Sequence, residues 1–356
     1  MNVTINTQRA LTFITLFLLF SQTAQATSNL CPIATPHAYT NNLNVSSKYA
    51  PNDLTRSTEI EIDQESLFIQ KQLNSFSAGI VYFSDYYVHY RDDERGKVGL
   101  KCIHNWLSDW ASNDAITTYT TSPTGKALRS WTLSSISSAL LKVKFFAGDK
   151  WALTPTESAW LKRLAEHVMY DYYGRTDSIP NRVNNHDYWA AWATTATGIL
   201  VKKRRFTDWG YVVFSHAMQQ STIDSQTQTA YLPNELGRGQ LGIHYSHFAI
   251  TPLVMLAEYL PLLGYSIHYQ EQQILSDLAS FASLSVLSPE SLSHLTVYVQ
   301  QTPSPAILSW SIPFKYRHPD NVLVNQLLNE YNDIINGYIQ IGGNIKPMHP
   351  FDPTLH

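Results

Sequence analysis

The chain has 356 residues, of which 44% are hydrophobic and 15% are charged, and its formal net charge at pH 7 is −3. A chain of this size can bury a large core in one domain or two. The weakly negative charge gives no support to nucleic acid or an anionic membrane surface as a partner. It does permit a polyanionic substrate, because a cleft can concentrate a few Lys and Arg side chains.

Residues 1–26 have the pattern of a secretory signal peptide. Arg9 precedes the uncharged apolar stretch of residues 10–20, and Ala24-Gln25-Ala26 offers a small-x-small cleavage site. The apolar stretch is well short of the roughly 20 residues that span a membrane, and the rest of the chain suggests no second span. We therefore predict an exported, periplasmic protein without membrane insertion, whose mature residues 27–356 form a single domain.

The chain contains two cysteines, Cys31 and Cys102, and both lie beyond the predicted cleavage site. An even number of cysteines in an exported protein predicts a disulfide bond. That bond would tie the N-terminal arm to a helix. Two free buried thiols are the alternative.

From about residue 60 onward the pattern is mainly helical, because apolar residues recur at steps of three and four. The clearest helix start has Thr154 as N-cap, Pro155 at the first helical position and Glu157 completing a capping box, and Gly174 follows its last turn. Other apolar stripes run from Ile103 to Ala111 and from Leu128 to Val143. Further helices are predicted at about 187–202, 205–220, 247–263, 270–286 and 321–336.

Two segments do not follow this pattern. Residues 76–97 are rich in tyrosine and charge, which predicts a loop or an interrupted helix that could cover a cleft or simply lie on the surface. Leu295, Val297 and Val299 alternate as in a strand, but the run is short and isolated. The fold class is therefore all-α. Helices of similar length with short connections suit antiparallel pairs, stacked as an open solenoid or curled into a toroid.

The first pair of candidate catalytic residues is Asn185 and His186. They lie in an Asn-Asn-His-Asp run directly before an apolar helix, so the simple alternative is that Asn184 or Asn185 caps that helix. A helix N-terminus also attracts an anion such as a carboxylate. The same field disfavours a protonated His186 and helps to keep it a neutral base.

The second pair is Arg238 and Tyr245, seven residues apart in a segment that contains glycines. A cation beside a phenol lowers the pKa of the phenol, which makes it a usable proton carrier. The alternative is that Arg238 pairs with Glu235 and Tyr245 packs under a helix. Together with the amide and imidazole of the first pair, these groups suit removal of a proton next to a carboxylate with expulsion of a sugar oxygen.

Other residues could contact such a substrate. Lys48 and Lys126 are candidate contacts for a carboxylate, although both could equally be solvated, and Tyr188 and Trp189 could offer a stacking face to a sugar ring or belong to the core. His244 and His247 have a possible metal spacing but lack an evident third ligand, so we predict no metal and no cofactor.

The chain resembles the alginate lyases of polysaccharide lyase family 5, the periplasmic mannuronate lyases of alginate-handling bacteria. The string Asn-His-x-Tyr-Trp-Ala-Ala-Trp, residues 185–192, is highly specific for this family. The supporting matches are Ser47-Lys48-Tyr49, Cys102 with Asn105-Trp106-Leu107 and Trp110-Ala111, Thr124-Gly125-Lys126 with Trp131, Leu232-Pro233-Asn234-Glu235-Leu236, and Gly342-Gly343.

The resemblance implies an incomplete α/α toroid with a deep substrate groove and a metal-independent β-elimination on 1,4-linked polyuronate, above all mannuronate-rich alginate. Asn185, His186, Arg238 and Tyr245 would occupy the catalytic positions. It also implies an anionic polysaccharide as partner and leaves room for association with a polysaccharide secretion complex. The residues expected to bind substrate are Ser47, Lys48, Pro123, Thr124, Lys126, Tyr188 and Trp189.

The chain departs from the family's usual pattern in three places. Pro123 stands where a histidine is common, Ser246-His247 where His-Asn is common, and Gly239 and Leu241 where basic residues are common. Fewer cations in the groove bear on which uronate is preferred, for example glucuronan, and on the number of subsites, but not on the reaction type.

Two other functions compete with this hypothesis. An inverting glycoside hydrolase would need two carboxyl groups roughly 6.5 to 9.5 Å apart, and Asp187 and Glu235 are the best placed; a first-turn acid and a partner for a nearby base explain them better. The other competitor is a periplasmic polysaccharide-binding protein without activity, which has no need of a phenol seven residues from an arginine.

Overall fold

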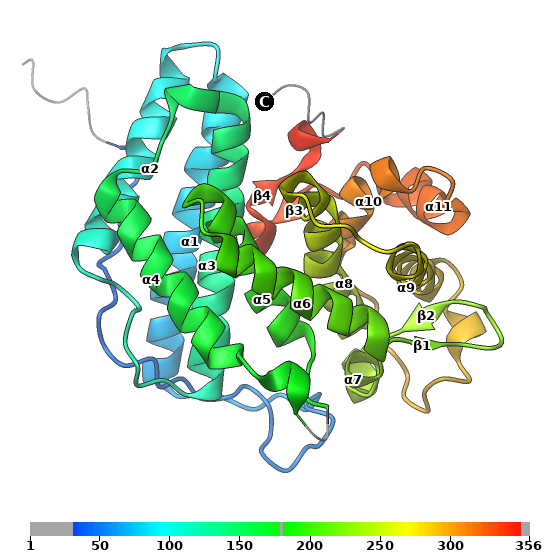
Figure 1. Cartoon of the computed structure of the whole chain (residues 1–356). Helices are drawn as coiled ribbons and strands as arrows, with labels where there is room; N and C mark the ends of the chain where they lie inside the picture. Colours follow the sequence, from blue (N-terminus) through cyan, green and yellow to red (C-terminus); the bar gives the residue numbers. More distant parts are fainter. Residues whose placement is uncertain (1–30, 179–180, 350–356) are drawn as a thin grey trace, which may run out of the picture. The chain divides into compact units, whose positions relative to one another are not determined.

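The computed structural model describes residues 31–178 and 181–349, so the predicted signal peptide lies outside the described residues. The chain divides into two compact units, Met1–Ala34 and Thr35–His356, and the second holds every element named below. Helices dominate it, which confirms the all-α prediction (Figure 1). The α-helices are α1 (Gln64–Tyr90), α2 (Glu94–Ser112), α3 (Pro123–Ala147), α4 (Pro155–Tyr172), α5 (Asn185–Leu200), α6 (Arg204–Gln220), α7 (Pro233–Leu236), α8 (Gly242–Tyr259), α9 (Tyr269–Leu287), α10 (Ser311–Arg317) and α11 (Val322–Tyr331).

The remaining elements are short. Strands β1 (Thr222–Ile223) and β2 (Ala230–Tyr231) pair antiparallel, and so do β3 (Gly337–Tyr338) and β4 (Gly343–Asn344). The 3-10 helices are η1 (Gly148–Lys150), η2 (Arg175–Asp177), η3 (Gly239–Leu241), η4 (Pro261–Leu263), η5 (Pro289–Leu292), η6 (Pro305–Trp310), η7 (Ile339–Ile341) and η8 (Lys346–Met348).

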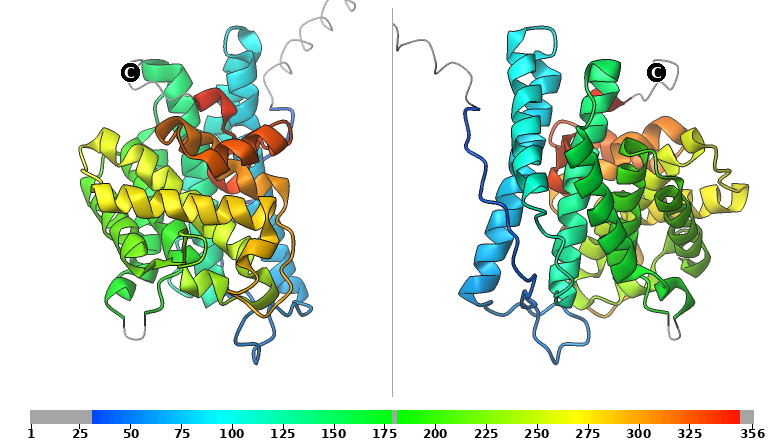
Figure 2. Two further views of the ribbon diagram at one scale, coloured as in Figure 1. Left: turned by 90° about the vertical axis from the view of Figure 1, so that its right-hand side faces the viewer. Right: turned by 60° about the vertical axis from the view of Figure 1, so that its left-hand side comes forward.

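Helix α5 is the centre of the packing. It contacts α3, α4, α6 and α8, while α3 also contacts α1 (Figure 1). Because neighbours cover α5 on all sides, every residue from Tyr188 to Gly198 is buried. On another side of the unit, α9 packs beside α11 (Figure 2). The predicted site residues at the N-terminus of α5 are therefore held by a largely buried helix.

The predicted start of the helix at residue 155 is confirmed. The Thr154 side chain accepts a hydrogen bond from the Glu157 N–H at 3.3 Å, and the Glu157 carboxylate accepts one from the Thr154 N–H at 2.8 Å. Pro155 opens α4, and Gly174 follows its end with φ of 78°. The left-handed conformation there favours glycine.

Of the two predictions for residues 76–97, a loop and an interrupted helix, the interrupted helix is confirmed. These residues continue α1 to Tyr90 and, after a turn, begin α2, for which Asp93 is the N-cap and accepts a hydrogen bond from the Arg95 N–H. Tyr82, Tyr86 and Tyr90 lie along one side of α1. The ring centroids of Tyr82 and Tyr86 are 6.0 Å apart, and those of Tyr86 and Tyr90 are 4.6 Å apart. The strand-like alternation at 295–299 forms no strand.

Buried Lys142 on α3 fixes the C-terminal segment to the helices. Its ammonium group pairs with Asp85 of α1 and donates to the carbonyl oxygens of Gly342 and Asn344. Gly342 has a φ of +83° and lies so close to the backbone of α3 that an added Cβ would be 2.6 Å from a backbone nitrogen there. Glycine is therefore required at this position for the segment to approach α3.

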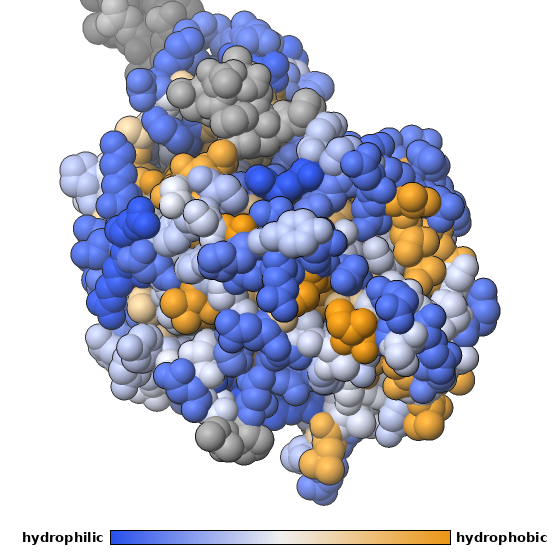
Figure 3. All heavy atoms as spheres, turned by 45° about the vertical axis from the view of Figure 1, so that its right-hand side comes forward, coloured by the Kyte–Doolittle hydropathy of each residue, from blue (hydrophilic) through white to orange (hydrophobic). Residues whose placement is uncertain are grey.

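One helical stretch among the described residues, Gly239–Leu263, is long and apolar enough to cross a membrane by composition, a candidate that the sequence analysis did not identify. Its window is 78% buried inside the protein, as in the core helix of a globular domain. On the face drawn in Figure 3, hydrophilic residues dominate and apolar residues form small separate patches.

Both cysteines are engaged. Neither Cys31 nor Cys102 is free, and both are disulfide-bonded. The sequence prediction of a disulfide is confirmed.

Candidate active site

The N-terminus of α5 presents the first pair of candidates because Asn184, and not Asn185, caps the helix. The Asn184 side chain accepts a hydrogen bond from the His186 N–H at 3.0 Å, and the Asp187 carboxylate accepts one from the Asn184 N–H at 2.9 Å. This capping box leaves the side chains of Asn185 and His186 free for other contacts.

Asn185 is completely buried and bound to Glu235. Its backbone N–H donates to Glu235 Oε1 at 2.6 Å, and its side-chain Nδ2 donates to Glu235 Oε2 at 2.7 Å. Asn185 Oδ1 has no hydrogen-bond partner among the described residues. The predicted partner of Glu235, a nearby base, is wrong: the carboxylate binds this amide.

His186 stacks on Trp131 of α3, with ring centroids 5.6 Å apart and an interplanar angle of 21°. Burial lowers the pKa of His186 to about 3, and the charges of Arg175 and Arg238 lower it further in the same direction. The imidazole is therefore neutral at ordinary pH, as predicted. The largest cause is burial, where the sequence argument relied on the field of the helix.

Arg238 lies between a loop and two tyrosine rings. Its Nε and Nη2 donate to the carbonyl oxygens of Thr55 and Arg56 at 2.8 Å and 2.9 Å. Its Cζ lies 3.8 Å from the centroid of the Tyr245 ring and 5.5 Å from that of Tyr49. Among the described residues it forms no ion pair with a carboxylate, so the predicted alternative of a pair with Glu235 is wrong. A cation without an acidic partner is suited to bind an anion.

Tyr245 is in contact with this cation, but its pKa shifts opposite to the expectation. Its hydroxyl lies 2.5 Å from the hydroxyl of Tyr49. Burial raises the pKa of Tyr245 and the Tyr49 hydrogen bond adds to the rise, while Arg238 lowers it by less. The sequence argument considered only the cation, whereas loss of solvent outweighs it.

Aromatic contacts join the two pairs of candidates. Phe248 lies one helical turn after Tyr245, and its ring centroid is 6.2 Å from that of Tyr245 and 6.1 Å from that of Trp131. Trp131 in turn stacks on His186. The structure therefore brings His186, Arg238 and Tyr245 around one region. Asn185 adjoins it as the buried residue before His186 in α5.

Residues 46–60, which we call the covering loop, lie over this region. They are drawn in blue at the lower edge of Figure 1. Asp53 organises the loop by accepting hydrogen bonds from the N–H groups of Thr55, Ser57 and Thr58 at 2.7 to 2.8 Å. Gly239 has a φ of +56°, and a Cβ there would meet two side chains of the loop at 2.9 Å. The glycine at this position thus gives the loop room beside Arg238.

Five of the expected substrate-binding residues fall into two accessible groups. Ser47 and Lys48 are exposed in the covering loop, where Lys48 Nζ pairs with Glu59 at 2.5 Å. Pro123 and Thr124 open α3, eight and seven residues before Trp131, and Lys126 pairs with Asp171 of α4 at 3.3 Å. These positions stay predictions, because the structure contains no sugar.

Tyr188 and Trp189 do not present a face to a sugar. Both side chains are 0% exposed because neighbouring helices enclose α5. The Trp189 ring packs against Phe248 and Tyr338, at centroid distances of 5.1 Å and 6.2 Å. The alternative, that both belong to the core, is correct for this structure.

His247 is also a core residue. Its Nδ1 accepts a hydrogen bond from Trp310 Nε1 at 3.0 Å, and its Nε2 lies 3.0 Å from Ser285 Oγ. The nearby His244 packs against Tyr245. No group of three or more metal-ligating side chains occurs within residues 31–178 and 181–349.

The two carboxyl groups proposed for a hydrolase have structural partners. Asp187 is 1% exposed, closes the capping box and pairs with Arg175 at 3.0 Å. Glu235 is 0% exposed and bound to Asn185. Capping, an ion pair and the two Asn185 bonds engage both carboxyl groups, so the geometry does not favour them as the acid and base of a hydrolase.

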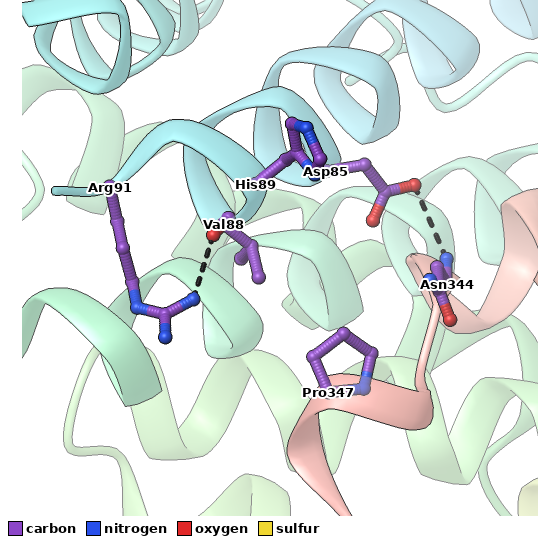
Figure 4. Close-up of a pocket in the computed structure, with 6 residues that line it drawn as sticks. All are labelled: Asp85, Val88, His89, Arg91, Asn344 and Pro347. Atoms are coloured by element: carbon purple, nitrogen blue, oxygen red, sulfur yellow. Dashed lines mark hydrogen bonds between the residues drawn. The ribbon is translucent and has the colours of Figure 1, made fainter. Parts of the chain in front are cut away.

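A surface pocket of about 230 Å³ lies elsewhere, between the end of α1 and the C-terminal segment (Figure 4). Arg91 donates to the Val88 carbonyl oxygen at 2.9 Å, and Asp85 accepts from the Asn344 N–H at 3.2 Å. The pocket shares no residue with the candidate site.

Sequence reasoning missed several neighbours of the site. Tyr49 and Trp131 were noted only as parts of motifs, and Phe248 and Arg56 were not noted. Tyr49 directly follows two predicted binding residues, which was the one available signal. The contact of Tyr49 with Tyr245 spans 196 positions, and no local pattern predicts such a contact.

Comparison with known proteins now gives the family. The model of the family described as alginate lyase matches residues 40–292. The chain belongs to the alginate lyase family. It is 32% identical over 268 residues to an alginate lyase of Pseudomonas fluorescens, covering 72% of this chain and 67% of the relative, and 31% identical over 274 residues to one of Pseudomonas aeruginosa, covering 75% and 70%.

Solved structures of this family share the fold. A complex of alginate lyase A1-III with a tetrasaccharide superposes with a TM-score of 0.69 at 19% identity, covering 91% of this chain and 85% of that one. Alginate lyase A1-III from Sphingomonas species A1 gives a TM-score of 0.66 at 18% identity, with the same coverage. The fold is that of an α/α toroid, which confirms the predicted architecture.

Proposed function

We propose that this alginate lyase family member cleaves 1,4-linked polyuronate, above all mannuronate-rich alginate, by β-elimination. The observation that carries the proposal is Arg238, a cation without a carboxylate partner among the described residues, stacked 3.8 Å from the ring of Tyr245 and electrostatically coupled to neutral His186. Family membership supports the same substrate class.

The first task in this reaction is to neutralise the uronate carboxylate. The hydrogen on C5 is acidic only because of that neighbouring carboxylate, and a charged carboxylate resists formation of a carbanion. Arg238 supplies the positive charge, and Asn185 has a second Nδ2 hydrogen beyond the one that it donates to Glu235. Preorganised donors of this kind stabilise the enolate-like state as its charge develops.

The second task is to move protons. Tyr245, as the phenolate, takes the C5 proton from one epimer, and the neutral His186 imidazole takes it from the other, because the two epimers present C5–H on opposite faces; in both cases Tyr245 is then the phenol. The C4–O4 bond breaks, O4 receives a proton from Tyr245, and a C4=C5 double bond forms at the new non-reducing end. The His186 imidazole is neutral at any pH well above its pKa of about 3, so a ring nitrogen has a lone pair that can accept the proton.

We further propose that the protein acts in the periplasm and associates with a polysaccharide secretion complex. The signal pattern of residues 1–26 supports export. The disulfide-bonded state of both cysteines supports an oxidising compartment. Fractionation of cells that produce the full chain, followed by co-purification with tagged secretion components, tests both parts.

The decisive experiment incubates the purified mature protein with pure polymannuronate, polyguluronate and glucuronan, with a chelator present. We expect a rise in near-ultraviolet absorbance from the unsaturated product, fastest with polymannuronate. Tyr245→Phe should lose about 10²- to 10⁴-fold in turnover while still binding the polymer. Saturated products, binding without cleavage, or full activity of Tyr245→Phe would contradict the proposal.

A further inference from the structure

The short helix α7 joins the two halves of the candidate site. Asn234 Nδ2 donates to the carbonyl oxygen of Val183 at 2.8 Å, and Glu235 binds Asn185, so both polar residues of the helix hold the segment that leads into α5. Arg238 follows directly, and its N–H donates to the Glu235 carbonyl oxygen at 3.1 Å. One turn of chain therefore contacts the residues on both sides of the site.

Glu235 uses both of its carboxylate oxygens on a single residue. Oε1 accepts from the Asn185 backbone N–H at 2.6 Å and Oε2 accepts from Asn185 Nδ2 at 2.7 Å. These two bonds fix both the position of the first residue of α5 and the orientation of its amide. Because a carboxylate only accepts hydrogen bonds, it dictates that the amide nitrogen, not Oδ1, faces it.

We propose that Glu235 is a positioning residue for the elimination reaction, whose ionised carboxylate holds the Asn185 amide so that its second N–H is available to the uronate carboxylate. The inference rests on the proposed function. The inference gives the Glu of the Leu-Pro-Asn-Glu-Leu motif a role. A neutral side chain at residue 235 would present a donor to Asn185, which permits the opposite amide orientation, with Asn185 Oδ1 facing residue 235.

The surroundings of Glu235 make this arrangement sensitive to pH. Burial raises the pKa of Glu235 to about 7, against the opposing effects of the two Asn185 bonds and Arg238, and Asp187 raises it further. The other titratable group that it influences is Tyr188 on α5. Below that pH the carboxyl group carries an O–H, which can donate to Asn185 Oδ1 and release the amide orientation.

A double-mutant cycle tests the coupling between the two residues. Glu235→Gln should lower kcat on polymannuronate about 10- to 100-fold, and the acid limb of the pH profile near pH 7 should disappear. Glu235→Gln combined with Asn185→Ala should be no slower than Asn185→Ala alone, because Glu235 acts through that amide. Effects that multiply, or an acid limb that persists in Glu235→Gln, would overturn the inference.

The matched control is Asp187→Asn, which removes a carboxylate that is also buried, in the first turn of α5, but is bonded to Asn184 and Arg175. Burial raises its pKa to about 6, so the control also decides which acid causes the limb. We expect Asp187→Asn to keep the acid limb and to combine with Asn185→Ala multiplicatively. If Asp187→Asn loses the acid limb of the pH profile, the assignment of that limb to Glu235 is overturned.

Two further measurements keep the outcome clear. If Glu235→Gln does not fold, as judged by its thermal melting curve, Glu235→Asp retains the charge but shortens the reach, and the same non-additivity with Asn185→Ala is expected. If the wild-type protein has no lyase activity on any polyuronate, the proposed function and this inference both fail. If the wild-type protein is active but the effects of Glu235→Gln and Asn185→Ala on kcat multiply, only this inference fails.

Discussion

The hydroxyl groups of Tyr49 and Tyr245 lie 2.5 Å apart and share a hydrogen bond. This bond attaches the covering loop to the candidate proton carrier, and Arg238 attaches the same loop through the carbonyl oxygens of Thr55 and Arg56. A sugar that reaches Tyr245 therefore meets a hydroxyl that is already bonded to Tyr49. The loop contributes to the chemistry of the site as well as covering it.

Tyr49→Phe should shift the pH dependence of polymannuronate cleavage to lower pH. The hydrogen bond from Tyr49 raises the pKa of Tyr245, so its loss lowers that pKa and provides the phenolate at a lower pH. The stability cost should be about 1 kcal/mol, as for one hydrogen bond. Profiles of kcat/KM against pH and thermal melting measure the two effects.

Tyr39→Phe is the matched control for this prediction. The Tyr39 hydroxyl donates to the Asn42 carbonyl oxygen at 2.8 Å, outside the covering loop. Its removal should cost a similar amount of stability and leave the pH profile of activity unchanged. A Tyr49→Phe profile that superimposes on the wild-type profile would contradict the role given to Tyr49.

The sequence predicted those parts of the structure that depend on local rules. The capping box of α4 needs only Thr154, Pro155 and Glu157, and all three take their predicted places. For residues 76–97 the sequence left a loop and an interrupted helix open, although the tyrosine spacing of four places these side chains on one side of a helix. The helix continues until Asp93 begins the next one.

Burial could not be predicted where it depends on tertiary packing. Trp189 resembled a sugar platform, but α5 has neighbours on all sides, so the ring is enclosed. The direction of the Tyr245 pKa shift could not be predicted either. The sequence spacing suggests that Arg238 is near Tyr245, as the structure confirms at 3.8 Å, but it does not show that burial removes solvent from the hydroxyl. The covering loop has no hydrophobic period, so its position over Arg238 is a finding of the structure alone.

Arg238→Lys should lower kcat about 100-fold despite keeping the positive charge. An ammonium group cannot donate to both carbonyl oxygens of the covering loop in the geometry of Nε and Nη2, and it does not stack as a plane over Tyr245. Steady-state kinetics on polymannuronate measure the change. Arg163→Lys is the control, since Arg163 binds exposed Asp114 through the same two nitrogens away from the site. Equal activities of the two variants would contradict a specific role for the Arg238 guanidinium.

Lys48→Ala should raise KM for polyuronate several-fold and weaken its dependence on salt, with little loss of stability. Lys48 is 53% exposed and its pair with Glu59 is worth less than about 1 kcal/mol, yet its charge acts on both His244 and Tyr245. KM measured across a range of ionic strength tests this. Lys97→Ala, which breaks a similar exposed pair with Glu94, should leave KM unchanged. If the two variants behave alike, Lys48 does not contact the substrate.

The free energy of unfolding should fall as the pH decreases from about 6.5 toward 3, and buried His247 should account for part of the slope. Burial lowers the pKa of His247 to about 3 in the folded protein, while the unfolded chain binds a proton near pH 6.5. The unfolded state therefore holds more protons in this range, so stability is fully present above pH 6.5 and is lost as the pH falls through the folded pKa.

His247→Gln tests this because it removes the titrating group and retains a polar side chain beside Trp310 and Ser285. It should be less stable at pH 7 by about 1 to 3 kcal/mol, since the two imidazole hydrogen bonds are not both replaced. Its stability should decline less steeply in acid, by up to about 1.4 kcal/mol per pH unit for one proton. Urea unfolding at a series of pH values measures both quantities. Parallel slopes for the variant and the wild-type protein would show that His247 is not kept neutral by the fold.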